Sequence, residues 1–105
     1  MISVLSSEDC QKAWQKFRYS AQKNYFALYS SVLGGITKDP SYMTVPLDDH
    51  VVHRGDGVFE AIKCLNHKVY LWQAHKDRMS ISSAGLGLKL PKNLEEIVEA
   101  TVKAG

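Results

Sequence analysis

The chain has 105 residues, of which 45% are hydrophobic and 23% are charged, and its formal net charge is +2. This length and composition are typical of one soluble globular domain, residues 1–105, with a modest hydrophobic core. The small net charge does not indicate a nucleic-acid or membrane partner, and no apolar run reaches the roughly 18 residues of a membrane span.

The N-terminal segment predicts an amphipathic helix. Ser6 is the expected N-cap, and acids rather than bases follow it, which argues against a secretory signal or a transit peptide. The apolar residues of this segment follow the spacing i, i+3, i+4, i+7 and therefore share one helical face. They are Cys10, Ala13, Trp14 and Phe17.

Strand-forming residues dominate the next segment. Residues 25–33 read Tyr-Phe-Ala-Leu-Tyr-Ser-Ser-Val-Leu, a composition that predicts a strand, and the glycine pair 34–35 permits a bend after it. Residues 42–47 predict a short extended stretch, and residues 48–50 predict a loop.

A hairpin and two helices are expected in the second half of the chain. Residues 57–64 alternate with period two and predict a strand, residues 66–67 form a tight turn, and residues 69–72 form the return strand. A helix follows over about residues 74–84, with Gly85 marking its end. The last helix begins after Asn93, which resembles a capping box with Glu96. Because a tight turn joins antiparallel strands, we expect an α+β fold with a mainly antiparallel sheet and flanking helices.

Arg78 is the first candidate site residue. It follows His75 by one helical turn on a face of small and apolar residues, where a guanidinium needs an anion. The anion is either a bound phosphate or carboxylate or an internal acid such as Glu60, and a third possibility is a stem that reaches water. Glu60 lies between Val58 and Ile62 on its strand face, so it needs a partner if it is buried, and Arg78 or His75 can supply one.

Cysteines and histidines predict no further chemistry. Cys10 and Cys64 lie far apart within apolar patterns, so we expect two buried free thiols of a cytoplasmic protein rather than a disulfide. Asp48, His50 and His53 have a spacing that could hold a metal, but no further ligand completes the set, and we predict no metal site.

One long segment resembles a known family. Residues 45–60 read Val-Pro-Leu-Asp-Asp-His-Val-Val-His-Arg-Gly-Asp-Gly-Val-Phe-Glu. The matching residues downstream are Tyr70, His75, Arg78, Ser83-Ala84 and Leu90-Pro91. This pattern is similar to the N-terminal half of fold-type IV pyridoxal-phosphate enzymes, the class IV aminotransferases that include branched-chain and D-amino-acid aminotransferases. The likeness extends from about Tyr25 to the last helix.

The resemblance implies roles for individual residues. In this class, the arginine at the position of Arg78 grips the phosphate of pyridoxal 5'-phosphate, and the aromatic residue at the position of Phe59 borders the substrate side-chain pocket. Phe59 would otherwise be a core residue. The resemblance also implies that Arg54 meets a substrate carboxylate, where an isolated loop cation would simply be solvated. Glu60 and His75 would support the site.

The resemblance also implies what this chain lacks. The family's Schiff-base lysine is not among these residues, since Lys63, Lys76 and Lys89 occupy positions that the family does not use for it. We therefore expect a small N-terminal domain that alone is inactive and does not bind the cofactor, from a homodimeric enzyme acting on amino acids and 2-oxo acids. Two alternatives remain: an aminodeoxychorismate lyase, which makes 4-aminobenzoate, and a non-catalytic α+β interaction domain.

Overall fold

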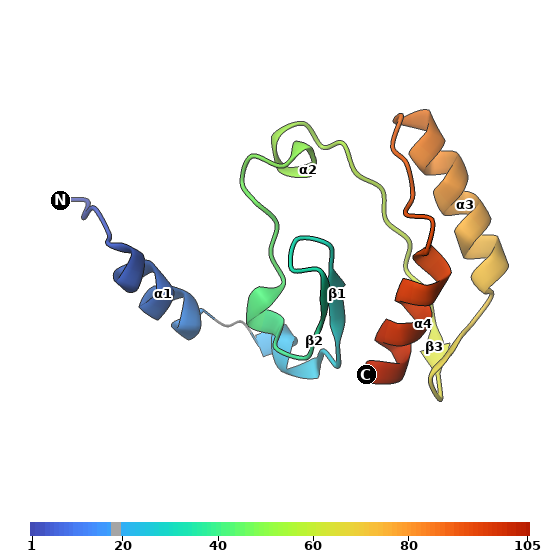
Figure 1. Ribbon diagram of the computed structural model, residues 1–105, viewed down its shortest axis with the longest axis horizontal. Coiled ribbons are helices and arrows are strands. Elements are labelled where there is room, and N and C mark those ends of the chain that lie inside the picture. Colours follow the sequence, from blue (N-terminus) through green and yellow to red (C-terminus); the bar gives the residue numbers. More distant parts are fainter. Residues whose placement is uncertain (18–19) are drawn as a thin grey trace.

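The computed structural model describes residues 1–17 and 20–105, except for the side chains of residues 20 and 21. In chain order its elements are α1 (Ser7–Lys16), the 3-10 helix η1 (Ser20–Asn24), the strands β1 (Leu28–Ser30) and β2 (Gly35–Thr37), the 3-10 helix η2 (Pro40–Tyr42), α2 (His50–His53), the strands β3 (Cys64–Leu65) and β4 (Lys68–Val69), and the helices α3 (Trp72–Gly85) and α4 (Leu94–Ala104). Helix α1 lies at one end of the molecule, and α3, α4 and β3 lie toward the other end (Figure 1).

Helix α1 begins where the sequence predicts. The Ser6 side chain accepts from the backbone N–H of Asp9, and the Asp9 carboxylate accepts from the N–H of Ser6, which completes a capping box. On the apolar face, Trp14 and Phe17 stack with ring centroids 5.2 Å apart. No residue of the helix is buried, so this face is left uncovered.

Two antiparallel hairpins supply the strands, and they confirm the α+β class. In the first hairpin Tyr29 of β1 pairs with Ile36 of β2, and Gly34 turns the chain with a φ of 76°. The second hairpin pairs β3 with β4 and turns through Asn66 and His67, with φ values of 52° and 62°. Positive φ at both central residues is the requirement of the tight hairpin turn that the sequence predicts here.

The predicted strand over residues 57–64 is wrong for most of its length, because only Cys64–Leu65 pairs with another strand. The exposure of the side chains in this segment nevertheless alternates with a period of two residues. Val58, Glu60 and Ile62 are partly buried, whereas the residues between them are exposed. The sequence pattern therefore predicts the alternating exposure of these side chains. It does not predict whether another strand pairs with the segment, because pairing depends on the tertiary structure.

Other predicted elements also have different boundaries in the structure. Residues 25–33 contain only the short strand β1, and residues 42–47 contain no strand. The loop predicted at 48–50 is confirmed for residues 48 and 49, but His50 begins α2, and the Asp49 carboxylate caps this helix by accepting from the N–H of Val51. The return strand ends before Leu71, whose φ of 54° breaks the extended backbone at the start of α3.

The two C-terminal helices are confirmed, although one detail is wrong. Helix α3 extends two residues earlier than expected and ends at Gly85, and α4 follows Asn93. The Asn93 side chain makes no capping hydrogen bond, so the predicted capping box is absent. Helix α4 contacts β1 and β4, and Nδ1 of His67 at the hairpin tip lies 3.0 Å from the carbonyl oxygen of Val102.

The expected hydrophobic core is absent from the part of the chain that the structure describes. Its buried residues are Gln22, Ser41 and Ser83, and no hydrophobic residue is among them. The accessible surface is 8664 Å², whereas a compact monomer of this mass exposes about 5,900 Å². The radius of gyration of 16.4 Å likewise exceeds the roughly 13 Å of a compact chain of this length.

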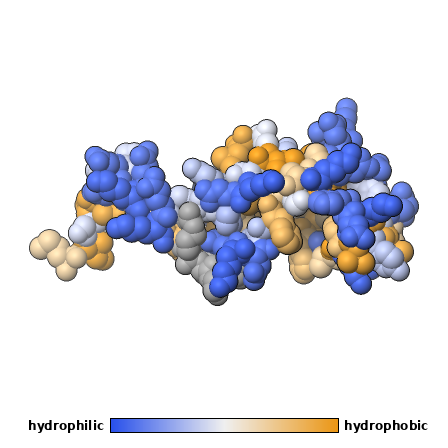
Figure 2. All heavy atoms as spheres, turned by 90° about the horizontal axis from the view of Figure 1, so that it is seen from below, coloured by the Kyte–Doolittle hydropathy of each residue, from blue (hydrophilic) through white to orange (hydrophobic). Residues whose placement is uncertain are grey.

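Exposed apolar side chains gather on the surface between more polar regions (Figure 2). Cys10 and Cys64 are both exposed, so the expectation of buried thiols is wrong. The apolar pattern that predicted their burial is present, but the elements do not close over it. Such uncovered apolar area favours association with another protein surface.

Candidate functional site

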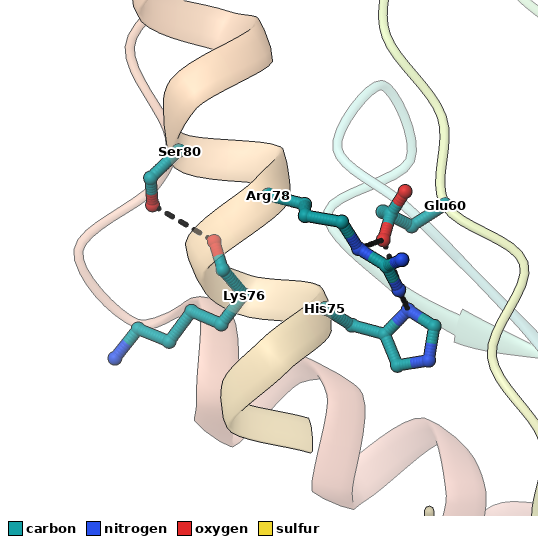
Figure 3. A network of polar contacts seen from close by, with 5 residues as sticks. All are labelled: Glu60, His75, Lys76, Arg78 and Ser80. Carbon is teal, nitrogen blue, oxygen red and sulfur yellow. Dashed lines mark hydrogen bonds and ion pairs between the residues drawn. The ribbon is translucent and has the colours of Figure 1, made fainter. Parts of the chain in front are cut away.

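The candidate site is a cluster of Glu60, His75 and Arg78, which we call the anion cluster (Figure 3). Glu60 comes from the unpaired extended segment, and its partly buried face turns it toward α3. His75 and Arg78 lie one turn apart on α3, and residues with this spacing are neighbours on a helix surface. The cluster therefore joins two parts of the chain that are 15 residues apart.

Three short contacts define the geometry of the cluster. Nδ1 of His75 lies 2.9 Å from Oε1 of Glu60, and it also lies 2.9 Å from Nη2 of Arg78. The Nε of Arg78 forms an ion pair with the same Glu60 oxygen at 3.2 Å. Glu60 thus has both of the partners that the sequence offers it.

Exposure differs sharply within the cluster. The side chains of His75 and Glu60 are 13% and 20% exposed, whereas that of Arg78 is 62% exposed. The hydrogen bond with His75 lowers the pKa of the Glu60 carboxyl below its usual value, and the positive charge of Arg78 adds to this effect. Partial burial acts in the opposite direction. The carboxylate is therefore ionised at neutral pH.

The chemical capacity of the cluster lies in Arg78. Its guanidinium is always charged, and its fork of N–H donors matches the oxygens of phosphate or carboxylate. One edge of the fork is held by Glu60 and His75, and no other described residue engages the remaining N–H groups. A held but mostly exposed guanidinium is able to bind an external anion, and this fits the phosphate group that the resemblance implies.

The other two candidate residues lie outside the anion cluster. Nε of Arg54 lies 3.5 Å from the Asp56 carboxylate in the turn after α2, and the Arg54 side chain is 67% exposed. Phe59 is 88% exposed, which rules out the alternative of a core residue in this structure. The described contacts do not bring Arg54 or Phe59 together with Arg78, so their roles stay predictions.

Two hollows lie elsewhere on the surface. One of about 900 Å³ is lined by residues 24–28, β3 and the end of α4. The other, of about 430 Å³, lies between the second hairpin, the start of α3 and α4. It contains Trp72, whose buried indole Nε1 has no hydrogen-bond partner among the described residues. No sequence pattern predicts the buried indole nitrogen of Trp72 or the contact of His67 with α4.

Residues 1–17 and 20–105 contain neither a candidate metal cluster nor a candidate membrane span. No group of three His, Cys, Asp or Glu side chains gathers there in a way that could hold a metal ion. No helix in that part of the chain is long and apolar enough to cross a membrane.

The fold and the anion cluster define an α+β protein with an arginine that is suited to bind an anionic group. Several proteins of known name are similar to this chain in sequence. A protein of Arabidopsis thaliana named "D-amino-acid transaminase, chloroplastic" is 41% identical over 96 residues, which are 91% of this chain and 25% of that protein. A match of 96 residues within 105 includes residues 10–96 wherever it begins, so the anion cluster falls within it.

Bacterial relatives match a shorter stretch. A Listeria monocytogenes protein named "D-alanine aminotransferase" is 35% identical over 60 residues, or 57% of this chain and 21% of that protein. A Rickettsia bellii protein named "Probable branched-chain-amino-acid aminotransferase" is 40% identical over 57 residues, or 54% of this chain and 20% of that protein. No protein-family model and no solved structure matches the chain.

The chain is therefore a homologue of the D-amino-acid and branched-chain aminotransferases of class IV, which confirms the resemblance inferred from residues 45–60 and their downstream matches. The chain spans about a quarter or less of the length of these curated relatives.

Proposed function

We propose that this chain forms the phosphate-gripping side of a pyridoxal-phosphate-dependent aminotransferase that exchanges an amino group between an amino acid and a 2-oxo acid. The observation that carries the proposal is Arg78, a mostly exposed guanidinium fixed along one edge by Glu60 and His75. A charged, forked donor in this state is suited to a phosphate dianion. The cofactor would supply an electron sink for the amino-group chemistry.

The remaining residues receive supporting roles in the proposal. Glu60 and His75 hold Arg78, Phe59 borders the substrate side chain, and Arg54 meets the substrate carboxylate. The high exposure of Phe59 and Arg54 supports these roles, because both side chains are available to a ligand or to another protein surface. Lys63, Lys76 and Lys89 are not proposed to carry the cofactor.

The relatives favour one reaction over its alternatives. Their names describe transaminases of D-amino acids and of branched-chain amino acids, and these are the substrate classes that we propose. The same names do not favour the lyase that makes 4-aminobenzoate or a non-catalytic interaction domain. We further propose a cytoplasmic location, which a fluorescent fusion expressed in the native cell would test.

An assay of the protein at its natural length tests the function. D-alanine and L-leucine, each offered with 2-oxoglutarate, should yield pyruvate or 4-methyl-2-oxopentanoate only when pyridoxal phosphate is present. The 105-residue chain should show no turnover, and it should form no more Schiff-base absorbance with pyridoxal phosphate than with pyridoxal. Release of 4-aminobenzoate from aminodeoxychorismate, without amino transfer, would instead establish the lyase.

Association is a second expectation of the proposal, which includes a homodimer. The exposed surface exceeds that of a compact monomer by more than the roughly 800 Å² that each partner buries in a standard interface. We therefore expect the chain to sediment as a dimer or larger species at tens of micromolar. A single monomeric boundary at this concentration would contradict the expectation.

A further inference from the structure

We propose that α1 is a self-association helix, through which two copies of this chain pair side by side and in opposite directions. Helix α1 contains no buried residue and lies at one end of the molecule, away from α3, α4 and β3 (Figure 1). The contact would use a surface that the anion cluster does not share. The inference therefore does not depend on the role of Arg78.

The contact face of α1 combines two small and two large apolar side chains. Cys10 and Ala13 lie toward the N-terminal end of the face, and Trp14 and Phe17 lie toward the other end with their rings stacked. Cys10 is exposed, and Trp14 and Phe17 are 39% and 49% exposed. Tryptophan is enriched among the residues that anchor protein–protein contacts. This face therefore suits a protein partner.

The order of small and large side chains favours an antiparallel pair. When two copies of α1 run in opposite directions about a point between residues 13 and 14, Ala13 of each copy meets Trp14 of the other. Cys10 of each copy then meets Phe17 of the other. Small side chains opposite large ones allow two helix faces to interdigitate without voids. A parallel pair would instead place Trp14 against Trp14 and Ala13 against Ala13, which holds the helices apart at one level and leaves a gap at the next.

The charges of α1 favour the same direction. Asp9 and Lys16 are seven residues, or about two turns, apart, so they lie on the same flank of the apolar face. The two-fold axis of an antiparallel pair brings this flank of one copy against the same flank of the other, and Asp9 of each copy then lies near Lys16 of the other. In a parallel pair this flank would meet the opposite flank, which carries the uncharged Ser7 and Gln11.

A second copy suits this helix better than a lipid surface does. Amphipathic helices that bind membranes carry an excess of Lys and Arg on the polar face. In α1 the acids Glu8 and Asp9 balance Lys12 and Lys16, and Glu8 forms an ion pair with Lys12 at 3.2 Å. The contact covers only a few turns of helix, less than the roughly 800 Å² per partner of a standard interface, so we expect a reversible dimer.

Sedimentation velocity over a concentration series measures the association of the 105-residue chain and of two variants. Trp14→Ser removes the largest apolar side chain of the contact and should raise the dissociation constant about tenfold or more. Because α1 buries no residue, this variant should keep the circular dichroism spectrum of the parent chain. The matched control Ile81→Ser removes a side chain that is 74% exposed on α3, and it should associate as the parent does.

Disulfide cross-linking tests the direction of the pair, because both natural cysteines are free thiols. In a chain with Cys10→Ser and Cys64→Ser, the substitution Ala13→Cys should give a cross-linked dimer under mild oxidation, since residue 13 lies next to the two-fold axis. In a chain with Cys64→Ser alone, Cys10 should stay a thiol. The two copies of Cys10 would be about 10 Å apart along the helix axis, whereas a disulfide requires Cα atoms within about 7 Å.

Three results would overturn the inference. Ready cross-linking through Cys10 would exclude the antiparallel pair. A chain that stays monomeric, or a Trp14→Ser variant that associates as tightly as the parent, would exclude α1 as the contact, and the transaminase assay would still decide the proposed function. Binding to phosphatidylcholine vesicles with Trp14 buried in lipid, without pairing in their absence, would show that a membrane surface covers α1 instead.

Discussion

Replacing Arg78 with lysine will weaken the binding of pyridoxal phosphate to the natural-length protein by about ten- to a hundredfold. The loss of charge-assisted hydrogen bonds costs roughly 1.5–3 kcal/mol, and each 1.4 kcal/mol is a factor of ten in affinity. Lysine keeps the positive charge but cannot reproduce the planar fork. Because Arg78 is 62% exposed, the fold should change little. Equilibrium dialysis against the cofactor would measure the affinity.

Three comparisons separate cofactor binding from stability. Arg78→Ala should bind the cofactor more weakly than the lysine variant, and excess pyridoxal phosphate should partly restore the thermal midpoint of the lysine variant. Lys76→Gln removes a charge from the same helix, on a side chain that points away from the anion cluster (Figure 3), and should leave the affinity unchanged. If both Arg78 variants bind as the parent does but melt earlier, Arg78 is a structural ion-pair residue.

The helices were the predictable part of this fold because their signals are local. Each of these signals, the Ser6 cap of α1 and Gly85 at the end of α3, acts on residues within one or two turns of itself. Both helix ends are present in the structure. A strand over residues 57–64 would need a neighbouring strand that is distant in sequence. The structure shows the alternating exposure of the side chains in this segment but no such neighbour for most of its length. The predicted burial of Cys64 is wrong for the same reason, because burial requires a covering surface that the described residues do not provide.

The candidate site shows the same division. The residue types alone indicated that Glu60 would need a cation and that Arg78 would need an anion, and the structure pairs them. The shared contact at Nδ1 of His75 could not be predicted, because it depends on where the extended segment crosses α3. The homology identifies the class of the relatives, whereas the geometry shows how Arg78 is held.

The Glu60 contact should make the chain less stable in acid. The pKa of Glu60 in the folded chain lies below its ordinary value of 4.5, chiefly because of the hydrogen bond with His75. A carboxyl with a lowered folded pKa stabilises the fold fully above its unfolded pKa, and this contribution disappears as pH falls through the folded value. We therefore expect the contribution of Glu60 to be complete at neutral pH and to decline below about pH 4.5.

Glu60→Gln isolates that contribution, because it keeps the shape of the side chain and removes its charge. Thermal unfolding followed by circular dichroism would give the midpoint at about pH 7 and about pH 3 for the parent chain and the variant. The parent should lose more stability between these values than the variant, and the two should converge at the acid end. Glu99→Gln, at an exposed position of α4, should follow the parent at both values. An acid loss equal in all three proteins would show that the extended segment is not held to α3 by the charge of Glu60, and the anion cluster would then owe its geometry to packing alone.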